Sequence, residues 1–166
     1  MHTAIVMGVA QPAELAIFNL DARVERACEL IVDAGQAGAG WIIFPEAYLP
    51  GAPAGLWSGP QGDGLANELR AMARALAVVI PGVVSDRLCR VAQRSRVGVV
   101  IGVIERDNAI CYNSLLLIDA TGQICGHYRA PLDSDSQKRW TPVGSTIVRA
   151  SERLSSAEDW THVGGI

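Results

Sequence analysis

One carboxylate in this sequence stands where a chemically active group is expected. Glu46 follows the apolar run 41–44 and Pro45, and the β-branched and aromatic residues of that run are typical of a short strand buried on both faces. Proline has no backbone N–H to donate to a sheet, so the strand is predicted to end there. Open α/β sheets place their chemistry at strand ends. Glu46 is therefore a candidate general base; the alternative is a glutamate that caps the following turn.

The groups that could attack a substrate as thiolates or hold a metal are scattered along the chain. The sequence has four cysteines, none of them in a CxxC pair: Cys28, Cys89, Cys111 and Cys125. Each falls in an apolar segment, which predicts buried thiols rather than disulfides or a metal site. Cys111 and Cys125 are candidate substitute nucleophiles, but the sequence places no lysine near either, and the only histidine that could assist is His127, which alternates with Cys125 on one predicted strand. The histidines are too far apart to suggest a metal, and no cofactor is expected.

Length and composition limit the class of protein. The 166 residues suit a single domain, and hydrophobic residues make up 49% of them, enough for a core. The formal net charge is −3 and the charges are interspersed, which argues against a nucleic-acid partner because such proteins present a basic face. No apolar stretch has the length of a membrane span, and the first residues lack a targeting pattern. A cytoplasmic location without a membrane partner is therefore expected.

A strand–helix–strand unit is predicted to position Glu46. Residues 3–10 form a nearly continuous apolar run, which predicts a central strand. From Leu20 onward, apolar residues recur at three- and four-residue spacing, which predicts a helix capped by Asn19 or Asp21 and ended by Gly35 or Gly38. Because the strand at 41–44 follows this helix, the two strands are expected to pair in parallel.

The later elements complete the predicted α/β chain. A Gly- and Pro-rich loop with Trp57 at its centre follows Glu46 and could shape the rim of a pocket. The periodicity then predicts helices at 65–78 and 85–96, a strand at 97–104, a charged turn at 105–108, and a hairpin of 110–118 with 123–129. Beyond an irregular segment at 131–145, short strands are predicted at 146–150 and 160–166.

Several linked motifs resemble the nitrilase (carbon–nitrogen hydrolase) superfamily. They are Phe44-Pro45-Glu46-Ala47, the segment 100–107, Tyr112-Asn113-Ser114 and the segment 119–129, while Leu49-Pro50-Gly51 and the Trp57 region resemble the nitrilase branch. The resemblance implies an αββα sandwich, with two mixed sheets packed face to face beneath outer helices. Residues 1–166 would then be the N-terminal part of one nitrilase-like domain that is C-terminally incomplete. Members of the superfamily commonly assemble into homo-oligomers through their helices.

The resemblance also implies a chemistry that needs a glutamate base, a cysteine nucleophile and a lysine. In that chemistry a nitrile and water give a carboxylate and ammonia through a cysteine thioester. Glu46 matches the base, but Ala130 stands where the lysine follows the arginine of the motif, here Arg129. A second glutamate would fall near Gln137. The nucleophile follows a Gly-Gly-hydrophobe stretch, and this sequence ends within one, at residues 163–166.

These matches and departures leave three readings open. The chain could be a hydrolase piece completed by a longer product or a complementing chain, a degenerate homologue that serves as an assembly partner, or a small-molecule-binding domain. The isolated chain is expected to be inactive. Uncovered strand faces would favour oligomers, a complementing half or poor solubility. Whether Arg129 or Lys138 takes the place of the lysine is left open. Possible pocket residues are Tyr48, Trp57, Tyr112, Asn113, Arg129 and Gln137.

Overall fold

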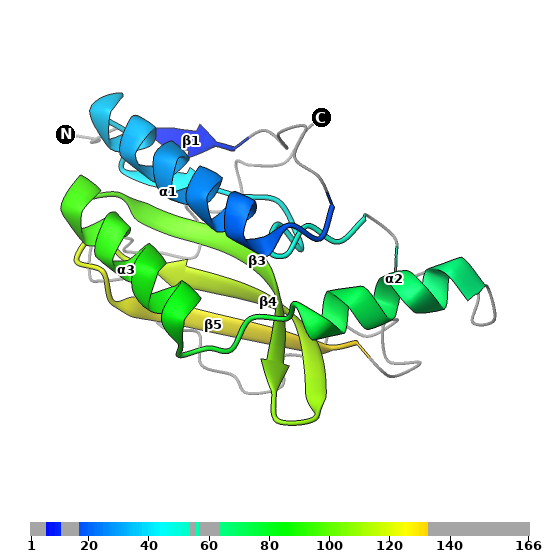
Figure 1. Ribbon diagram of the computed structural model, residues 1–166. Coiled ribbons are helices and arrows are strands. Elements are labelled where there is room, and N and C mark those ends of the chain that lie inside the picture. The colour runs from blue at the N-terminus through cyan, green and yellow to red at the C-terminus, as the bar shows by residue number, and fades with distance from the viewer. Residues whose placement is uncertain (1–5, 11–16, 54–55, 57–63, 133–166) are drawn as a thin grey trace, which may run out of the picture.

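Five strands lie side by side in one mixed sheet, in the order in which they occur in the sequence (Figure 1). This computed structural model describes residues 6–10, 17–53, 56 and 64–132. Within those residues the strands are β1 (Met7–Val9), β2 (Trp41–Ile43), β3 (Gly98–Asp107), β4 (Ile110–Ile118) and β5 (Ile124–Pro131). The helices are α1 (Leu20–Gln36), α2 (Gly64–Ala75) and α3 (Val83–Ser95). β1, β2 and β3 are parallel, as predicted for the first two, whereas β3, β4 and β5 are antiparallel.

Helices α1 and α3 cover the same face of the sheet, which we call the helix face (Figure 1). α1 begins at the predicted cap, where the Asn19 side chain accepts a hydrogen bond from the Ala22 N–H at 3.2 Å. Its apolar stripe packs onto alternate residues of the strands, because side chains of a strand point to opposite faces in turn. The core on this face includes Ala27, Ile31, Leu88, Ala92, Val99, Ile101, Val103, Leu116 and Ile118.

Strand β1 lies at an edge of the described sheet, so the prediction of a central strand at 3–10 was wrong for its described part. Met7 and Val9 are 51% and 68% exposed, because they point away from the helix face. Gly8 points toward α1 instead, where a Cβ would come within 3.9 Å of the Ala34 Cβ. β2 is likewise buried on only one side, through Ile42. The described residues thus supply one of the two sheets that the resemblance implies.

Strand β3 is bordered on one side by three separate segments of the chain. β2 pairs with its first residues, Leu49 bonds Gly102 and Ile104, and Val78 bonds Ile104 and Arg106. The helix predicted at 65–78 therefore ends early, at Ala75, because Val78 joins the sheet.

β3 also extends through Asp107, three residues beyond the predicted strand. The turn predicted at 105–108 consists instead of residues 108–109, where Asn108 has a φ of 53°. The hairpin of β4 and β5 forms as predicted.

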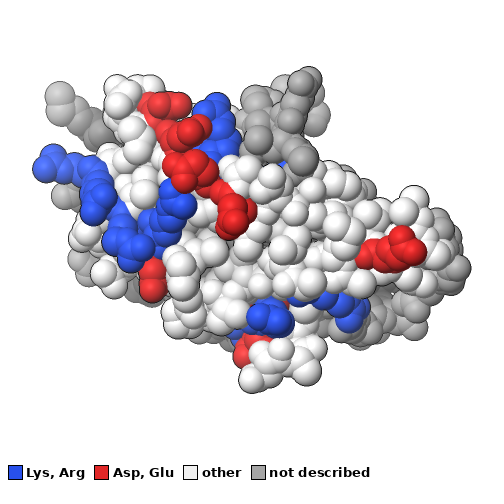
Figure 2. Space-filling view, in the orientation of Figure 1, with Lys and Arg blue, Asp and Glu red and all other residues white. Residues whose placement is uncertain are grey.

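The surface over α1 and α3 carries both signs of charge. In Figure 2, acidic side chains gather over α1 and basic ones over the neighbouring α3. Arg87 of α3 forms an ion pair with Glu25 of α1, and Arg26 pairs with Glu29 within α1 at 2.8 Å. Among the residues that the structure describes, no helix combines the length and the apolar character that a membrane crossing requires.

Some predictions fall on residues outside the described ranges. These are Trp57, Gln137, Lys138, the irregular segment from 133 onward, and the strands at 146–150 and 160–166. They stay predictions.

Candidate active site

The turn that carries Glu46 is held against β3 at both of its ends. The Phe44 N–H donates to the Val100 carbonyl oxygen at 2.8 Å, and the Leu49 N–H donates to the Gly102 carbonyl oxygen at 3.2 Å. Between these bonds the chain turns through residues 46–48, and Ala47 has a φ of 49°, in the left-handed region. Pro45 ends the hydrogen bonding of β2, as predicted, and Glu46 lies at the start of the turn.

Gly102 of β3 allows this turn to lie directly on the sheet. A Cβ at Gly102 would be 2.5 Å from the Pro45 carbonyl oxygen and 2.7 Å from the Cα of Glu46. Both are backbone atoms, which cannot rotate away from the contact. Glycine is therefore the residue that lets the backbone of Glu46 approach β3 so closely.

Asn113 links to both Glu46 and Ala130 on the second face of the sheet, opposite the helix face. The Asn113 side chain of β4 donates a hydrogen bond from Nδ2 to Oε1 of Glu46. Asn113 is directly opposite Ala130 of β5 in the antiparallel ladder. Residues so paired have Cβ atoms about 4.5–5.5 Å apart and point to the same face. Ala130, where the family resemblance predicts a lysine, therefore lies beside Asn113, the hydrogen-bond partner of Glu46.

The Glu46 side chain is both hydrogen-bonded and exposed. An exposed carboxylate with one oxygen held by an amide can accept a proton with its other oxygen. Among the described residues, no cationic side chain is recorded in contact with Glu46. The described arrangement can thus act as a base.

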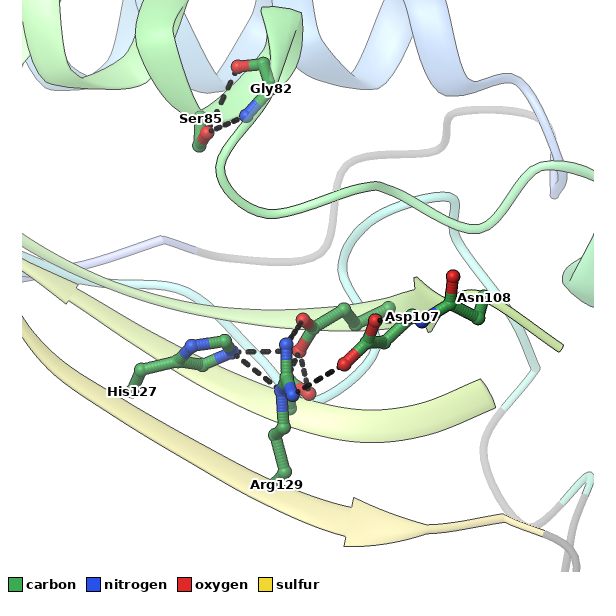
Figure 3. Close-up of polar contacts among 8 residues, drawn as sticks. Gly82, Ser85, Asp107, Asn108, His127 and Arg129 are labelled. Carbon is green, nitrogen blue, oxygen red and sulfur yellow. Dashed lines mark hydrogen bonds and ion pairs between the residues drawn. The ribbon is translucent and has the colours of Figure 1, made fainter. Parts of the chain in front are cut away.

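A second polar cluster lies behind this site, on the helix face (Figure 3). Glu105 of β3 is fully buried, and its Oε2 accepts hydrogen bonds from Ser114 Oγ at 2.6 Å and from Arg129 Nε at 3.0 Å. His127 Nε2 lies 2.7 Å from the same oxygen, and the guanidinium of Arg129 also binds Oε1. Arg129 reaches Asp107 as well, at 3.0 Å. Glu105 is thus bonded to side chains of both β4 and β5.

These bonds keep the Glu105 carboxyl ionised inside the protein. Burial by itself would raise its pKa, but hydrogen bonds from His127, Arg129 and Ser114 outweigh burial and lower the pKa below its ordinary value. The hydrogen bond to Glu105 in turn raises the pKa of Arg129. A buried charge is tolerated when it is paired and its remaining lone pairs are bonded, and both conditions are met here.

Two of the possible pocket residues point away from Glu46. Arg129 lies on the helix face, where it binds Glu105 and stacks over the Tyr112 ring at 5.1 Å. Tyr112 occupies the same face, since strand alternation separates both residues from Asn113 and Ala130. Arg129 therefore does not take the place of the missing lysine in this structure.

Tyr48 also lies apart from Glu46, in the core against α1. Its ring packs against Phe44 with centroids 4.9 Å apart, and the Arg23 guanidinium lies over it. Burial raises the pKa of its hydroxyl, whose oxygen has no hydrogen-bond partner among the described residues. Of the possible pocket residues that are described, only Asn113 contacts Glu46.

The cysteines do not supply a nucleophile beside Glu46. Burial raises the pKa of the Cys28, Cys89 and Cys125 thiols, which disfavours the thiolate. Cys111 shares the face of Asn113 but is 4% exposed, packed in the cluster of Ile104. Only Cys28 and Cys111 are buried, so the prediction of four buried thiols holds for two. The described part of the chain contains no group of three or more metal-ligating side chains.

Sequence reasoning missed the Glu105 cluster because it assigned Glu105 to a turn. The signal was present, since residues 99, 101, 103 and 105 continue one alternation along β3 and place the carboxylate in line with three buried valine and isoleucine side chains. A buried acid at such a position predicts a cationic partner.

The sequence of this chain is similar to those of known proteins. The chain matches the sequence profile of carbon–nitrogen hydrolases over residues 6–133. It is similar to a protein named nitrilase 2 from an unknown prokaryotic organism, with 35% identity over 96% of this chain and 52% of the relative. It is also similar to a cyanide hydratase from Leptosphaeria maculans, with 34% identity over 72% of this chain and 33% of the relative.

A solved structure shares the fold. The crystal structure of an amidase from Nesterenkonia sp. matches with a TM-score of 0.53 at 14% identity, over 75% of this chain and 42% of the amidase chain. At that identity the likeness concerns the fold alone. This chain spans about half the length of the nitrilase 2 that it matches, and less of the other two proteins.

Proposed function

Because the chain belongs to the carbon–nitrogen hydrolase family, we propose that it carries the general-base part of a site that hydrolyses a nitrile or an amide. The observation that supports this proposal is the placement of Glu46, which is held by Asn113, the residue opposite the lysine position, Ala130. The proposal treats residues 1–166 as part of one nitrilase-like domain in a cytoplasmic protein.

In the proposed reaction, Glu46 accepts the proton of a cysteine thiol, and the thiolate adds to the nitrile carbon. The nitrile nitrogen takes up protons, and one water molecule converts the adduct to a thioester as ammonia leaves. A second water molecule, deprotonated by Glu46, cleaves the thioester to the carboxylic acid and restores the thiol. With an amide, addition of the thiolate and loss of ammonia give the thioester directly.

The isolated chain is proposed to be inactive, because the described residues place neither a lysine nor a nucleophilic cysteine beside Glu46. Ala130 cannot stabilise the anionic adduct, and loss of one such donor typically costs about 10²–10³ in rate. Burial raises the pKa of the Cys28, Cys89 and Cys125 thiols and Cys111 is buried, and without a nucleophile the covalent path is lost. Ammonia release from aliphatic and aromatic nitriles should not exceed that of the Glu46→Ala chain. Release above that control would contradict the inactivity.

Complementation tests the role of Glu46 itself. An Ala130→Lys chain would be combined with the C-terminal half of the 35% identical nitrilase, and assembly would be checked by sedimentation. We expect ammonia release from the assembled pair. We expect none when the Ala130→Lys chain also carries Glu46→Ala. An assembled pair whose activity does not depend on Glu46 would argue against the general base.

The second face of the sheet suggests the partner. Met7, Val9 and Leu115 all point to this face and are each at least 38% exposed. An apolar sheet face of this kind is costly to leave in water, so a complementing chain or a second copy is proposed to cover it. Replacing Leu115 with Arg should shift sedimentation toward the monomer. A wild-type chain that sediments as a stable monomer would contradict this.

The alternative function is a non-catalytic homologue that assembles with a partner or binds a small molecule. Ala130 is the observation that favours it, since the charge stabiliser is absent from its position. If complemented Ala130→Lys protein assembles and binds a nitrile but releases no ammonia, this alternative is supported.

A further inference from the structure

We propose that Glu105 is a positioning residue for the Glu46 site, acting from the opposite face of the sheet. The inference rests on the proposed function, because it assigns Glu105 a part in the geometry of the proposed base. Glu105 does not contact Glu46; it acts through the two strands that carry Asn113 and Ala130.

Strand alternation connects the two faces. Ser114 and Arg129, which bind Glu105 on the helix face, are directly opposite each other in the ladder between β4 and β5. Their chain neighbours Asn113 and Ala130 are the next opposite pair, and they point to the second face. Asn113 and Ala130 are therefore each the chain neighbour of a residue that binds the Glu105 carboxylate.

The geometry of the carboxylate fixes how β4 and β5 lie on β3. One oxygen accepts from Ser114 of β4 and contacts His127 and Arg129 of β5, while the other accepts from Arg129. Sliding either strand would break these directional bonds. A slip of one residue would also turn Asn113 or Ala130 to the helix face, because the side-chain period of a strand is two.

One end of the ladder between β4 and β5 is irregular. Between Leu117 and Ile118 the ladder shifts register, at the end of the hairpin nearest its turn. Beyond Ser114, the helix-face side-chain contacts of β4 are made by Leu116 and Ile118, which are apolar and non-directional. The Glu105 cluster thus adds directional side-chain bonds, beside the backbone ladder, between the irregular end of the hairpin and the site.

The test compares a signature of the site in matched variants of the full chain. Asn113 has a side-chain NH₂ group whose two-dimensional ¹⁵N NMR signals report its bond to Glu46, and Asn113→Ala assigns those signals by their loss. Glu105→Gln should shift these signals. Ile118→Val changes a core residue of β4, the strand that carries Asn113, beyond the register shift. This variant should leave the Asn113 signals in place.

Two results would overturn the inference. In the first, Glu105→Gln moves the backbone signals of Ser114 and Arg129 but leaves the Asn113 side-chain signals unchanged. The other is equal shifts in Glu105→Gln and Ile118→Val, which would show only a general structural role. If Glu105→Gln does not fold, Ser114→Ala replaces it, with Ser114→Thr as the variant that keeps the hydroxyl and should restore the wild-type signals.

This result is independent of the hydrolysis experiment. If Glu46 is not a general base, the assembled pair shows no Glu46-dependent hydrolysis while Glu105→Gln still shifts the Asn113 signals. If Glu105 has no positioning role, the signals stay while Glu46-dependent hydrolysis persists.

Discussion

Asn113 and Ala130 face each other across β4 and β5, on the side of the sheet where Asn113 donates a hydrogen bond to Glu46. The first residue bonds to Glu46, whereas the second ends at its Cβ. Among the described residues, the site therefore combines an oriented carboxylate with an alanine where the family resemblance predicts a lysine.

Gly102→Ala should displace the Glu46 turn from β3. The new Cβ would meet backbone atoms of Pro45 and Glu46, and such overpacking costs about 1–3 kcal/mol of unfolding free energy. Urea unfolding would measure the loss, and the Asn113 side-chain NMR signals would report the displacement. Gly8→Ala is the matched control in the same sheet, because its Cβ would meet atoms no closer than 3.7 Å. Equal effects of the two substitutions would contradict the close approach.

Glu105→Ala should be among the most destabilising single substitutions in the chain. Removal of one member of a buried ion pair costs about 3–5 kcal/mol when the partner charge is left uncompensated; Arg129 keeps its ion pair with Asp107, so the loss should lie toward or below the lower end of that range. Urea unfolding of Glu25→Ala gives the comparison, since Glu25 pairs with Arg87 at an exposed position and should lose far less stability. Similar losses in both variants would mean that burial of Glu105 has little energetic effect.

The stability of the chain should fall as the solution becomes acidic, and Glu105 should contribute to the fall. Its native pKa is lowered, so the unfolded state binds the proton first and the stabilisation is complete only above the unfolded value, near 4.3. The contribution should be lost progressively as pH falls from about 5 through the lower native pKa. In Glu105→Gln the unfolding free energy should depend less on pH over this range. An unchanged slope would refute the assignment.

Each cysteine should react slowly with an alkylating reagent at neutral pH. The pKa values of Cys28, Cys89 and Cys125 are raised by burial, and Cys111 is shielded by its neighbours. Mass spectrometry of labelled peptides would give the four rates, with the urea-unfolded chain as the reference. Rapid labelling of Cys111 that depends on Glu46 would instead identify it as a substitute nucleophile.

Local signals in the sequence were sufficient to locate the turn that carries Glu46, the proposed base. Pro45 ended the strand as its missing N–H requires, and Glu46 followed on the exposed side of that end. The cap at Asn19 and the parallel pairing of the first two strands also followed from local rules. In each case the deciding interaction lies within a few residues of the pattern.

The errors arose where a distant contact decides the structure. The sequence placed Glu105 in a charged turn. In the structure the hairpin brings Ser114 and Arg129, which follow it in the chain, into contact with its carboxylate. Val78 matched the period of a helix but bonds to β3 instead. The apolar residues of β1 indicated burial, yet the described helices cover the other face of the sheet. The side-chain pattern of a strand alone does not specify which of its two faces a neighbouring layer will cover.

The three segments along the edge of β3 have a consequence for how this region can diversify. Leu49 and Val78 bond to neighbouring positions of one strand, with residues 50–77 between them. Both anchors are backbone hydrogen bonds, so they do not depend on the side chains of the intervening segment. Doubling the length of a flexible loop costs only about 0.6 kcal/mol. Segments of different length and composition could therefore be exchanged between these two points, beside Glu46, while the sheet keeps its register.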